Sequence, residues 1–363
     1  MRVIGFWLAM LVSIPSLATE SEKTEPADAA GVAILQYHHI GDDTPRVTSV
    51  TAAELEAHFE FLKDNDFTVL SLPDAAAQIE SGTLPERAAA ITIDDGWRNV
   101  YSEALAIFKA YQYPFTIFVN PKLMAETPHL YMTWEQLEEL QQYGATIANH
   151  SQSHDHMTWR QPHESEKQWL ERQRDEVLAA QQVIDEKLGP QPKLFAYPYG
   201  EYNPQLAEML VAEGYLAFAQ HSGPWGKYSP VGAIPRFPAS AQYANLETLQ
   251  TKLLSLPLPV IQATPESMIQ SATELRPTVE LTVKNSAHFR LSQMNCFYGS
   301  AVIQPHLKVI DDQLTLARIE LPTDLAIGRS RLNCTIPSTQ QNGRFYWYSH
   351  PFVRPDENGR WPD

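Results

Sequence analysis

Basic residues are scarce in this chain of 363 residues: 27 Lys and Arg stand against 43 Asp and Glu, and the net charge is −16. A surface with this excess of negative charge repels phosphate backbones, so we expect no nucleic-acid partner. Long apolar runs are also lacking. Beyond the first 14 residues, no segment approaches the roughly 20 consecutive apolar residues that cross a bilayer. The mature chain is therefore expected to be soluble, with no transmembrane segment.

The N-terminus has the pattern of a secretory signal. Arg2 precedes an apolar stretch over residues 3–14, and Ser16 and Ala18 are the small residues expected before cleavage after Ala18. We therefore predict a signal peptide over residues 1–18, a polar, disordered lead-in over 19–30, and an exported protein that is periplasmic or extracellular. The alternative is an uncleaved N-terminal anchor.

Cysteine is nearly absent. Cys296 and Cys334 are the only two, and both lie in the C-terminal third. In an exported chain such a pair is bridged more often than free, which predicts a disulfide. Closing that loop would stabilise the folded state by about 4 kcal/mol, because it lowers the entropy of the unfolded chain.

Two adjacent carboxylates, Asp94 and Asp95, stand where an apolar run over residues 88–93 gives way to Gly96. The run predicts a buried strand, and the glycine allows a sharp turn as the chain leaves the sheet. Like charges side by side are costly to bury unless a cation or a proton relieves them, and a metal ion is the simplest relief. The alternative is that Asp95 and Gly96 form a turn while Asp94 caps a helix from about Asn99.

A histidine cluster follows a second apolar run, over residues 145–148. His150 and His154 are four residues apart, a spacing that brings two imidazoles onto one ion on a helical or tightly turned segment. Two imidazoles and one carboxylate leave a divalent ion with open positions, as in a catalytic site. The alternative is a histidine-rich surface loop, since His156 and His163 lie close by.

Three motifs in this order resemble those of the polysaccharide deacetylases, carbohydrate esterase family four. The family's T-F-D-D-G is matched by residues 92–96, its H-[ST]-x-x-H by residues 150–154, and its R-x-P-Y in part by residues 196–200. The resemblance spans roughly residues 32–238. An early Y-H-H-I element at residues 37–40 is closest in style to the poly-N-acetylglucosamine deacetylases.

The resemblance implies a role for each matched residue. Asp95, His150 and His154 would hold a divalent metal, and Asp94 would be the general base toward the metal-bound water. A cation lowers the pKa of bound water toward about 7. The backbone amide of Tyr199 would stabilise the oxyanion. This ligand set favours zinc and also suits nickel or cobalt.

Two parts of the family pattern are displaced. The usual late histidine acid is not found, so the resemblance points to His38 in the early element. His39 is the nearest competitor, His221 is a weaker candidate, and a merely packed strand-end histidine is the alternative. The motif arginine that tethers the base is replaced by Ala196. We expect Arg236 to reach the site and tether Asp94 instead.

Apolar runs predict seven strands, at residues 32–37, 67–70, 90–93, 115–119, 145–148, 194–197 and 216–219. Helical patterns lie between most of them, near residues 101–110, 134–143, 164–187 and 204–213, and a capping box at Thr51 opens another. This alternation indicates a parallel sheet covered by helices. With site residues at the C-terminal strand ends, it predicts an α/β catalytic domain over 31–252, an incomplete (β/α)7-type barrel as in the family.

The pattern changes after residue 252. Pro257, Pro259 and Pro265 interrupt any periodicity, which predicts a linker over 253–268. Short, partly alternating runs follow at residues 278–283, 287–291, 307–310, 314–319, 331–336 and 345–349. They predict a small antiparallel β-sandwich accessory domain over 269–363. The aromatic run at 345–348 suits stacking on sugar rings; the alternative is that its rings pack inward.

These features predict an enzyme, a metal-dependent hydrolase that removes N-acetyl groups from N-acetylhexosamine residues of a polysaccharide. A poly-β-1,6-N-acetylglucosamine-like polymer is favoured, and chitin-type or peptidoglycan glycans are alternatives. The other readings are an O-acetyl esterase or other amide deacylase on the same fold, and a non-catalytic sugar-binding protein. The intact Asp94 and Asp95 argue against the binder, because binding alone needs no paired carboxylates beside a metal.

Overall fold

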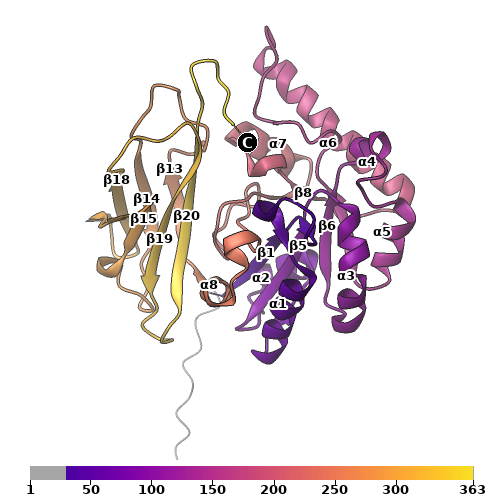
Figure 1. Ribbon diagram of the computed structural model, residues 1–363. Helices are drawn as coiled ribbons and strands as arrows, with labels where there is room; N and C mark the ends of the chain where they lie inside the picture. The colour runs from indigo at the N-terminus through magenta and orange to yellow at the C-terminus, as the bar shows by residue number, and fades with distance from the viewer. Residues whose placement is uncertain (1–29, 363) are drawn as a thin grey trace, which may run out of the picture.

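The computed structural model describes residues 30–362. An α/β unit built on a curled sheet lies beside a β unit built on two sheets, and α8 (Leu246–Leu253) leads from the first to the second (Figure 1). The predicted signal peptide and residues 19–29 of the lead-in lie outside the described residues. Of the helices within 30–362, none combines the length and the apolar character needed to cross a bilayer.

The α/β unit is organised by one sheet in the order β10-β1-β5-β6-β7-β8-β9, with β4 paired to β5 and β11 to β1. The strands are β1 (Gly31–Tyr37), β4 (Thr68–Val69), β5 (Ala88–Ile93), β6 (Phe115–Val119), β7 (Ala145–Asn149), β8 (Leu194–Ala196), β9 (Leu216–Phe218), β10 (Trp225–Gly226) and β11 (Phe237–Pro238). Pairing from β1 to β9 is parallel, so the C-terminal strand ends share one edge. The predicted α/β incomplete-barrel fold is confirmed.

Helices cover the sheet. They are α1 (Ala52–Asp64), α2 (Leu72–Ser81), α3 (Arg98–Tyr111), α4 (Pro121–Glu126), α5 (Trp134–Gln141), α6 (Glu166–Leu188) and α7 (Pro204–Ala212). The predicted capping box is present, because Thr51 and Glu54 each bind the other's backbone at the start of α1. The apolar face of α1, with Leu55 and Phe59 fully buried, contributes to the core that also holds apolar side chains of β1, β5 and α3. Burying that face holds the helix on the sheet.

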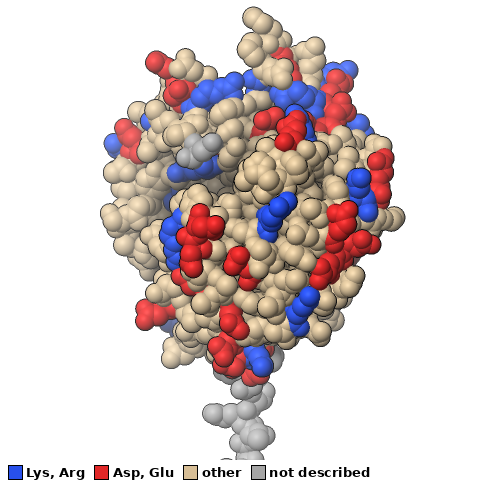
Figure 2. All heavy atoms as spheres, turned by 45° about the vertical axis from the view of Figure 1, so that its right-hand side comes forward, with Lys and Arg blue, Asp and Glu red and all other residues tan. Residues whose placement is uncertain are grey.

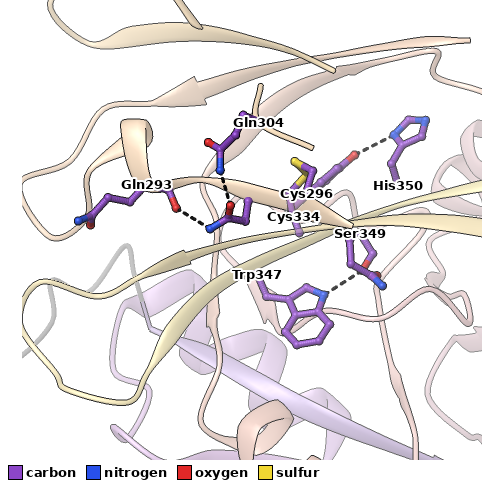
Figure 3. The surroundings of a disulfide bond; sticks show 10 residues. Gln293, Cys296, Gln304, Cys334, Trp347, Ser349 and His350 are labelled. Carbon is purple, nitrogen blue, oxygen red and sulfur yellow. Dashed lines mark hydrogen bonds between the residues drawn. A yellow bond between two sulfur atoms is a disulfide. The ribbon is translucent and has the colours of Figure 1, made fainter. Parts of the chain in front are cut away.

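The β unit is a sandwich of a five-stranded sheet, β12-β20-β19-β15-β16, and a four-stranded sheet, β13-β14-β18-β17. Its strands are β12 (Leu256–Pro257), β13 (Val260–Thr264), β14 (Thr278–Lys284), β15 (Asn295–Tyr298), β16 (Ala301–Ile303), β17 (His306–Val309), β18 (Leu314–Glu320), β19 (Gly328–Pro337) and β20 (Phe345–Arg354). Cys296 of β15 and Cys334 of β19 form the predicted disulfide within the apolar core (Figure 3).

The strand predictions for this unit need corrections. Residues 287–291, expected to be a strand, form a turn and a single bridge at Phe289, whereas β15 and β16 were not predicted. Strands β12 and β13 lie within 253–268, the stretch expected to be a linker. Each is an edge strand of its sheet, and edge strands tolerate proline, so Pro257 and Pro259 do not exclude them.

The aromatic run at the start of β20 packs inward and against the α/β unit. Tyr346 is 1% exposed in the sandwich core. The ring of Trp347 meets that of Phe237 edge-on at 5.5 Å between centroids. Tyr348 donates to or accepts from His350 at 3.3 Å. The run therefore serves packing between the two units.

Two uncharged histidines lie where the units meet. His221 and His350 both line the cleft between α7 and β20, and His221 Nδ1 and His350 Nε2 are buried with no hydrogen-bond partner among the described residues. Burial lowers the pKa of His350 to about 4. Burial, with the neighbouring His350 and Arg236, lowers the pKa of His221 to about 3.

These histidines predict a loss of stability in mild acid. The unfolded chain, where imidazole titrates near 6.5, takes up protons first, so the free energy of unfolding falls as pH drops below about 6.5 and levels off below the folded pKa. Each group contributes a slope of at most about 1.4 kcal/mol per pH unit. His350→Gln should reduce this slope in urea titrations between about pH 6 and 4.5. The exposed control His129→Gln should not, and equal slopes in both variants would contradict the assignment.

Candidate metal centre

Three ligand-type side chains converge at the C-terminal edge of the sheet. Asp95 follows β5, and His150 and His154 follow β7. The Nε2 atoms of His150 and His154 lie 3.2 and 3.3 Å from Asp95 Oδ1. One ligand atom from each residue lies within 4.8 Å of the others, the separation that one bound cation would span. The structure thus brings together the three residues predicted as metal ligands.

The remaining polar atoms of these side chains are held by the protein. Trp97 Nε1 donates to Asp95 Oδ2 at 2.7 Å, and His150 Nδ1 lies 2.7 Å from the carbonyl oxygen of Ala196. A carbonyl only accepts, so Nδ1 carries the proton and Nε2 presents a lone pair. Within residues 30–362, Asp95 Oδ1 and His150 Nε2 are buried with no hydrogen-bond partner. Two lone pairs facing each other fit a divalent cation placed between them.

The electrostatics of the cluster agree with this fit. Burial raises the pKa of Asp95, but the close contacts of its carboxylate with the imidazoles of His150 and His154 outweigh burial and hold that pKa well below its ordinary value. Burial lowers the pKa of His150, yet the contact with Asp95 and the charge of Asp94 leave it raised. A proton and a metal ion would therefore compete for the Nε2 lone pair of His150.

The backbone of the cluster takes unusual conformations. Asp95, Ser151 and His154 have φ values of 72°, 66° and 56°, in the left-handed region that most side chains avoid. Such strain persists only where the surroundings impose it. Ser151 Oγ accepts from the amide of His154 at 3.0 Å, and Asn120 Nδ2 donates to the carbonyls of His150 and Ser151. These bonds hold the histidine loop in place, so Ser151 orients it.

Asp94 is buried beside a full counter-charge. Its carboxylate is 0% exposed and accepts two hydrogen bonds from Arg236, at 2.6 and 2.8 Å. Gln36 Nε2 donates a third at 2.8 Å. Burial raises the pKa of Asp94, but the charge of Arg236 outweighs burial and keeps that pKa below its ordinary value. Arg236 thus lies where it was predicted, bound to Asp94 in place of the motif arginine that Ala196 replaces.

The three candidate acids have different surroundings. His38 Nε2 lies 3.9 Å from Asp94 Oδ2 with a fifth of its side chain exposed. His39 stacks on Trp97 at 4.5 Å between centroids, and burial lowers its pKa. His221, with its pKa lowered to about 3 by burial, is poorly suited to act as an acid near neutral pH because its imidazolium form is disfavoured. Of these three, His38 alone combines proximity to Asp94 with access to solvent.

Tyr199 stands at a sharp turn after β8. Its φ is 59°, and Gly200 follows with a φ of 69°. A Cβ on Gly200 would come within 2.5 Å of Gln220, so the turn requires glycine. The Tyr199 ring stacks on His156 at 4.0 Å and meets the metal-ligand candidate His154 at 4.7 Å between centroids. The backbone of Tyr199 is thereby fixed beside the cluster.

Residues 81–218 match the family model described as polysaccharide deacetylase. This segment contains Asp94, Asp95, His150, His154 and Tyr199. Over this segment the chain is similar to the polysaccharide deacetylase family. His38, Gln36 and Arg236 lie outside the matched segment, although the fold brings all three to the cluster.

Named relatives match part of this chain in sequence, and a solved structure shares its fold. The protein YxkH of Bacillus subtilis is 29% identical over 187 residues, which cover 51% of this chain and 63% of that protein. The poly-beta-1,6-N-acetyl-D-glucosamine N-deacetylase of Escherichia coli K12 is 24% identical over 261 residues, 61% of this chain and 39% of that protein. The structure of the Streptococcus pyogenes deacetylase PplD in complex with acetate has a TM-score of 0.56 and 21% identity. The match covers 62% of this chain and 99% of the PplD chain, and the two share a fold.

Three residues of the site were missed by the sequence analysis: Gln36, Trp97 and Asn120. Gln36 is the one polar side chain in the apolar run of β1, and Asn120 directly follows β6. A buried polar residue in or just after a parallel strand is a signal that could have identified both. Trp97 stacks on Tyr131 at 4.7 Å while it binds Asp95, a pairing that no local pattern indicates.

Removing a ligand should abolish metal binding. After dialysis against zinc, His150→Ala should retain no stoichiometric metal by elemental analysis. Trp97→Phe, which removes the hydrogen bond to Asp95 and keeps an aromatic ring beside Tyr131, should bind zinc about 10–100-fold more weakly. The exposed His163→Ala should bind as the unaltered chain does. Stoichiometric zinc in His150→Ala would contradict the assignment.

Removing Arg236 should destabilise the fold strongly. Arg236→Met leaves a buried, unpaired carboxylate, so the free energy of unfolding should fall by about 3–5 kcal/mol in urea denaturation. Adding Asp94→Asn should recover much of that loss. The matched control is Arg276→Met, which breaks an exposed ion pair with Asp324 and should cost at most about 1 kcal/mol. Similar losses for both arginines would refute the buried pair.

Proposed function

We propose that this chain is a metal-dependent deacetylase that hydrolyses N-acetyl groups on N-acetylhexosamine units of a polysaccharide, with a β-1,6-linked N-acetylglucosamine polymer favoured. One observation carries the proposal. A buried carboxylate, Asp94, fixed by Arg236, stands directly beside a second carboxylate that shares a cation site with His150 and His154. The proposal names zinc as the favoured cation, with nickel or cobalt as alternatives.

The relatives support the choice of polymer. Proteins named poly-beta-1,6-N-acetyl-D-glucosamine N-deacetylase, from Escherichia coli and Staphylococcus epidermidis, are 24% and 22% identical to this chain over their matched regions. The chain spans 39% and 59% of their lengths. The early Y-H-H-I element at residues 37–40, which is similar to that group, lies at the site through His38.

In the proposed mechanism Asp94 is the base. A bound cation supplies Lewis acidity toward water and the acyl oxygen. Asp94 takes a proton from the attacking water as the new carbon–oxygen bond forms at the acyl carbon. Arg236 and Gln36 hold both carboxylate oxygens and so keep the base ionised and oriented at neutral pH. The low pKa of Asp94 makes it a weak base, and proximity to the reacting water compensates.

The other residues complete the reaction. The backbone amide of Tyr199, at its strained turn, donates to the oxygen that becomes negative in the tetrahedral state. His38, whose Nε2 lies 3.9 Å from Asp94 Oδ2, gives a proton to the departing nitrogen as the carbon–nitrogen bond breaks. Acetate and a free amine result.

His38→Ala should therefore lower the rate of hydrolysis of amide substrates more than that of aryl acetate esters, because the leaving group of an aryl ester needs no proton.

Acetate release tests the proposal directly. The chain should release acetate from N-acetylated β-1,6-glucosamine oligomers. A chelator should stop the reaction, and zinc, nickel or cobalt should restore it. Asp94→Asn should lower kcat by at least about 100-fold, because general-base catalysis is lost, whereas the exposed His163→Ala should leave kcat unchanged.

Two outcomes would contradict the proposal. Acetate release that persists in the metal-stripped chain would show that the reaction needs no cation. Turnover that is unaffected by Asp94→Asn would show that Asp94 is not the base. Release from O-acetylated glycans alone would instead favour the O-acetyl esterase alternative.

A further inference from the structure

A groove of about 780 Å³ lies between the deacetylase domain and the β-sandwich. Its volume is in the range of about 300–1,000 Å³ typical of ligand sites. The domain contributes Tyr199, Gly200 and Tyr243 to its lining, and the sandwich contributes Phe297, Arg331 and others. Because the Tyr199 ring also meets His154 at 4.7 Å, the groove begins one side chain away from the candidate metal centre.

Strand periodicity places the sandwich wall of this groove. Cys296 and Cys334 are register partners on β15 and β19 and are fully buried in the sandwich core. Successive side chains of a strand point to opposite faces. The next register pair, Phe297 and Asn333, therefore points out of the sandwich, and both residues line the groove. The disulfide covalently joins the two strands that present this wall.

The same alternation places two arginines of β19 on the groove face. Arg329 and Arg331 share the face of Asn333, since they precede it by four and two positions. Arg331 Nη2 donates to the hydroxyl of Tyr243 at 2.8 Å and its guanidinium lies over the Tyr243 ring. Phe297, 37% exposed, presents an apolar ring next to these polar groups. Flat rings and hydrogen-bond donors together suit the faces and hydroxyls of pyranose units.

A buried carboxylate ties the sandwich to the turn that carries Tyr199. Glu201 is 0% exposed and binds His156 Nδ1 at 2.7 Å, Trp361 Nε1 at 2.6 Å and Arg329 Nη1 at 3.2 Å. Arg329 also donates to the Tyr199 carbonyl at 3.4 Å. The wall formed by β15 and β19 is thereby held at a fixed distance from the site where acyl groups would react.

The charges of the groove favour neutral sugar units. Arg329 is balanced by Glu201, and Asp324 is paired with Arg276. Arg331 has no carboxylate partner among the described residues. The one unbalanced positive charge, that of Arg331, would thus repel the ammonium group of a deacetylated unit in the groove. It would not repel a neutral acetamide. This local sign is the opposite of that of the whole chain, whose net charge is −16. Figure 2 shows clusters of acidic side chains with basic ones among them on the face of the molecule that it displays.

We propose that this groove is a binding subsite for N-acetylated hexosamine units that flank the reacting unit, with Phe297 as the stacking ring and Arg331 as the group that disfavours deacetylated units. The subsite rests on the proposed function for the identity of its polymer. The subsite gives the β-sandwich a part in substrate recognition. It retains acetylated stretches of the polymer and releases deacetylated ones.

Glycan binding without turnover tests the subsite separately from catalysis. In the Asp94→Asn background, titration calorimetry with an N-acetylated β-1,6-glucosamine pentamer should give binding that Phe297→Ala weakens at least fivefold and Phe297→Tyr preserves. Val309→Ala, on an exposed edge of the other sheet, is the control and should change nothing. Thermal unfolding of each variant verifies that it is folded.

The charge preference has its own variant. The fully deacetylated pentamer should bind the Asp94→Asn chain at least fivefold more weakly than the acetylated pentamer. Arg331→Gln, which removes the positive charge, should reduce this difference in affinity. Unchanged affinity in Phe297→Ala, or no binding of either pentamer, would overturn the subsite. Acetate release by the unaltered chain is measured independently. If that chain hydrolyses acetylated glycans and Phe297→Ala leaves the affinity for the pentamer unchanged, the subsite is refuted and the proposed function stands.

Discussion

The burial of two adjacent carboxylates is the constraint on which the rest of this site depends. Asp94 and Asp95 follow one strand, and neither can stay ionised in an apolar sheet edge without its own positive partner. The left-handed backbone at Asp95, with a φ of 72°, directs the two groups to different neighbours. Asp94 meets Arg236, and Asp95 meets the two histidines. The separation of roles between base and metal ligand is a consequence of this division.

Much of the fold and the centre of the site could be predicted from the sequence. All seven strands expected in the first unit are present, because buried parallel strands have continuous apolar runs and are short. The metal-ligand candidates come from two such runs and are marked by their position at the strand ends. Arg236 could be predicted because one motif position was missing a cation and few arginines lay near a strand end.

Other parts depend on contacts that no local pattern records. Trp97 binds Asp95, yet its aromatic side chain looks like that of an ordinary core residue. In the sandwich, β15 and β16 were missed because a partly exposed strand such as Asn295–Tyr298 lacks a clear alternation. The strands among the prolines were missed because edge position, which makes proline acceptable, is a property of the assembled sheet.

Ala196 and Arg236 also bear on how such sites change over time. Arg236 reaches Asp94 from 142 positions further along the chain, whereas the family's arginine would be the first residue of the third motif, where this chain has Ala196. A carboxylate that needs a counter-charge at one point in space can draw it from any backbone segment that passes that point. The alanine at position 196 is therefore no sign that the carboxylate has lost its counter-charge, because Asp94 has a guanidinium partner in Arg236. Lineages could exchange one arginine for the other through an ancestor carrying both, with no generation in which the carboxylate stood alone.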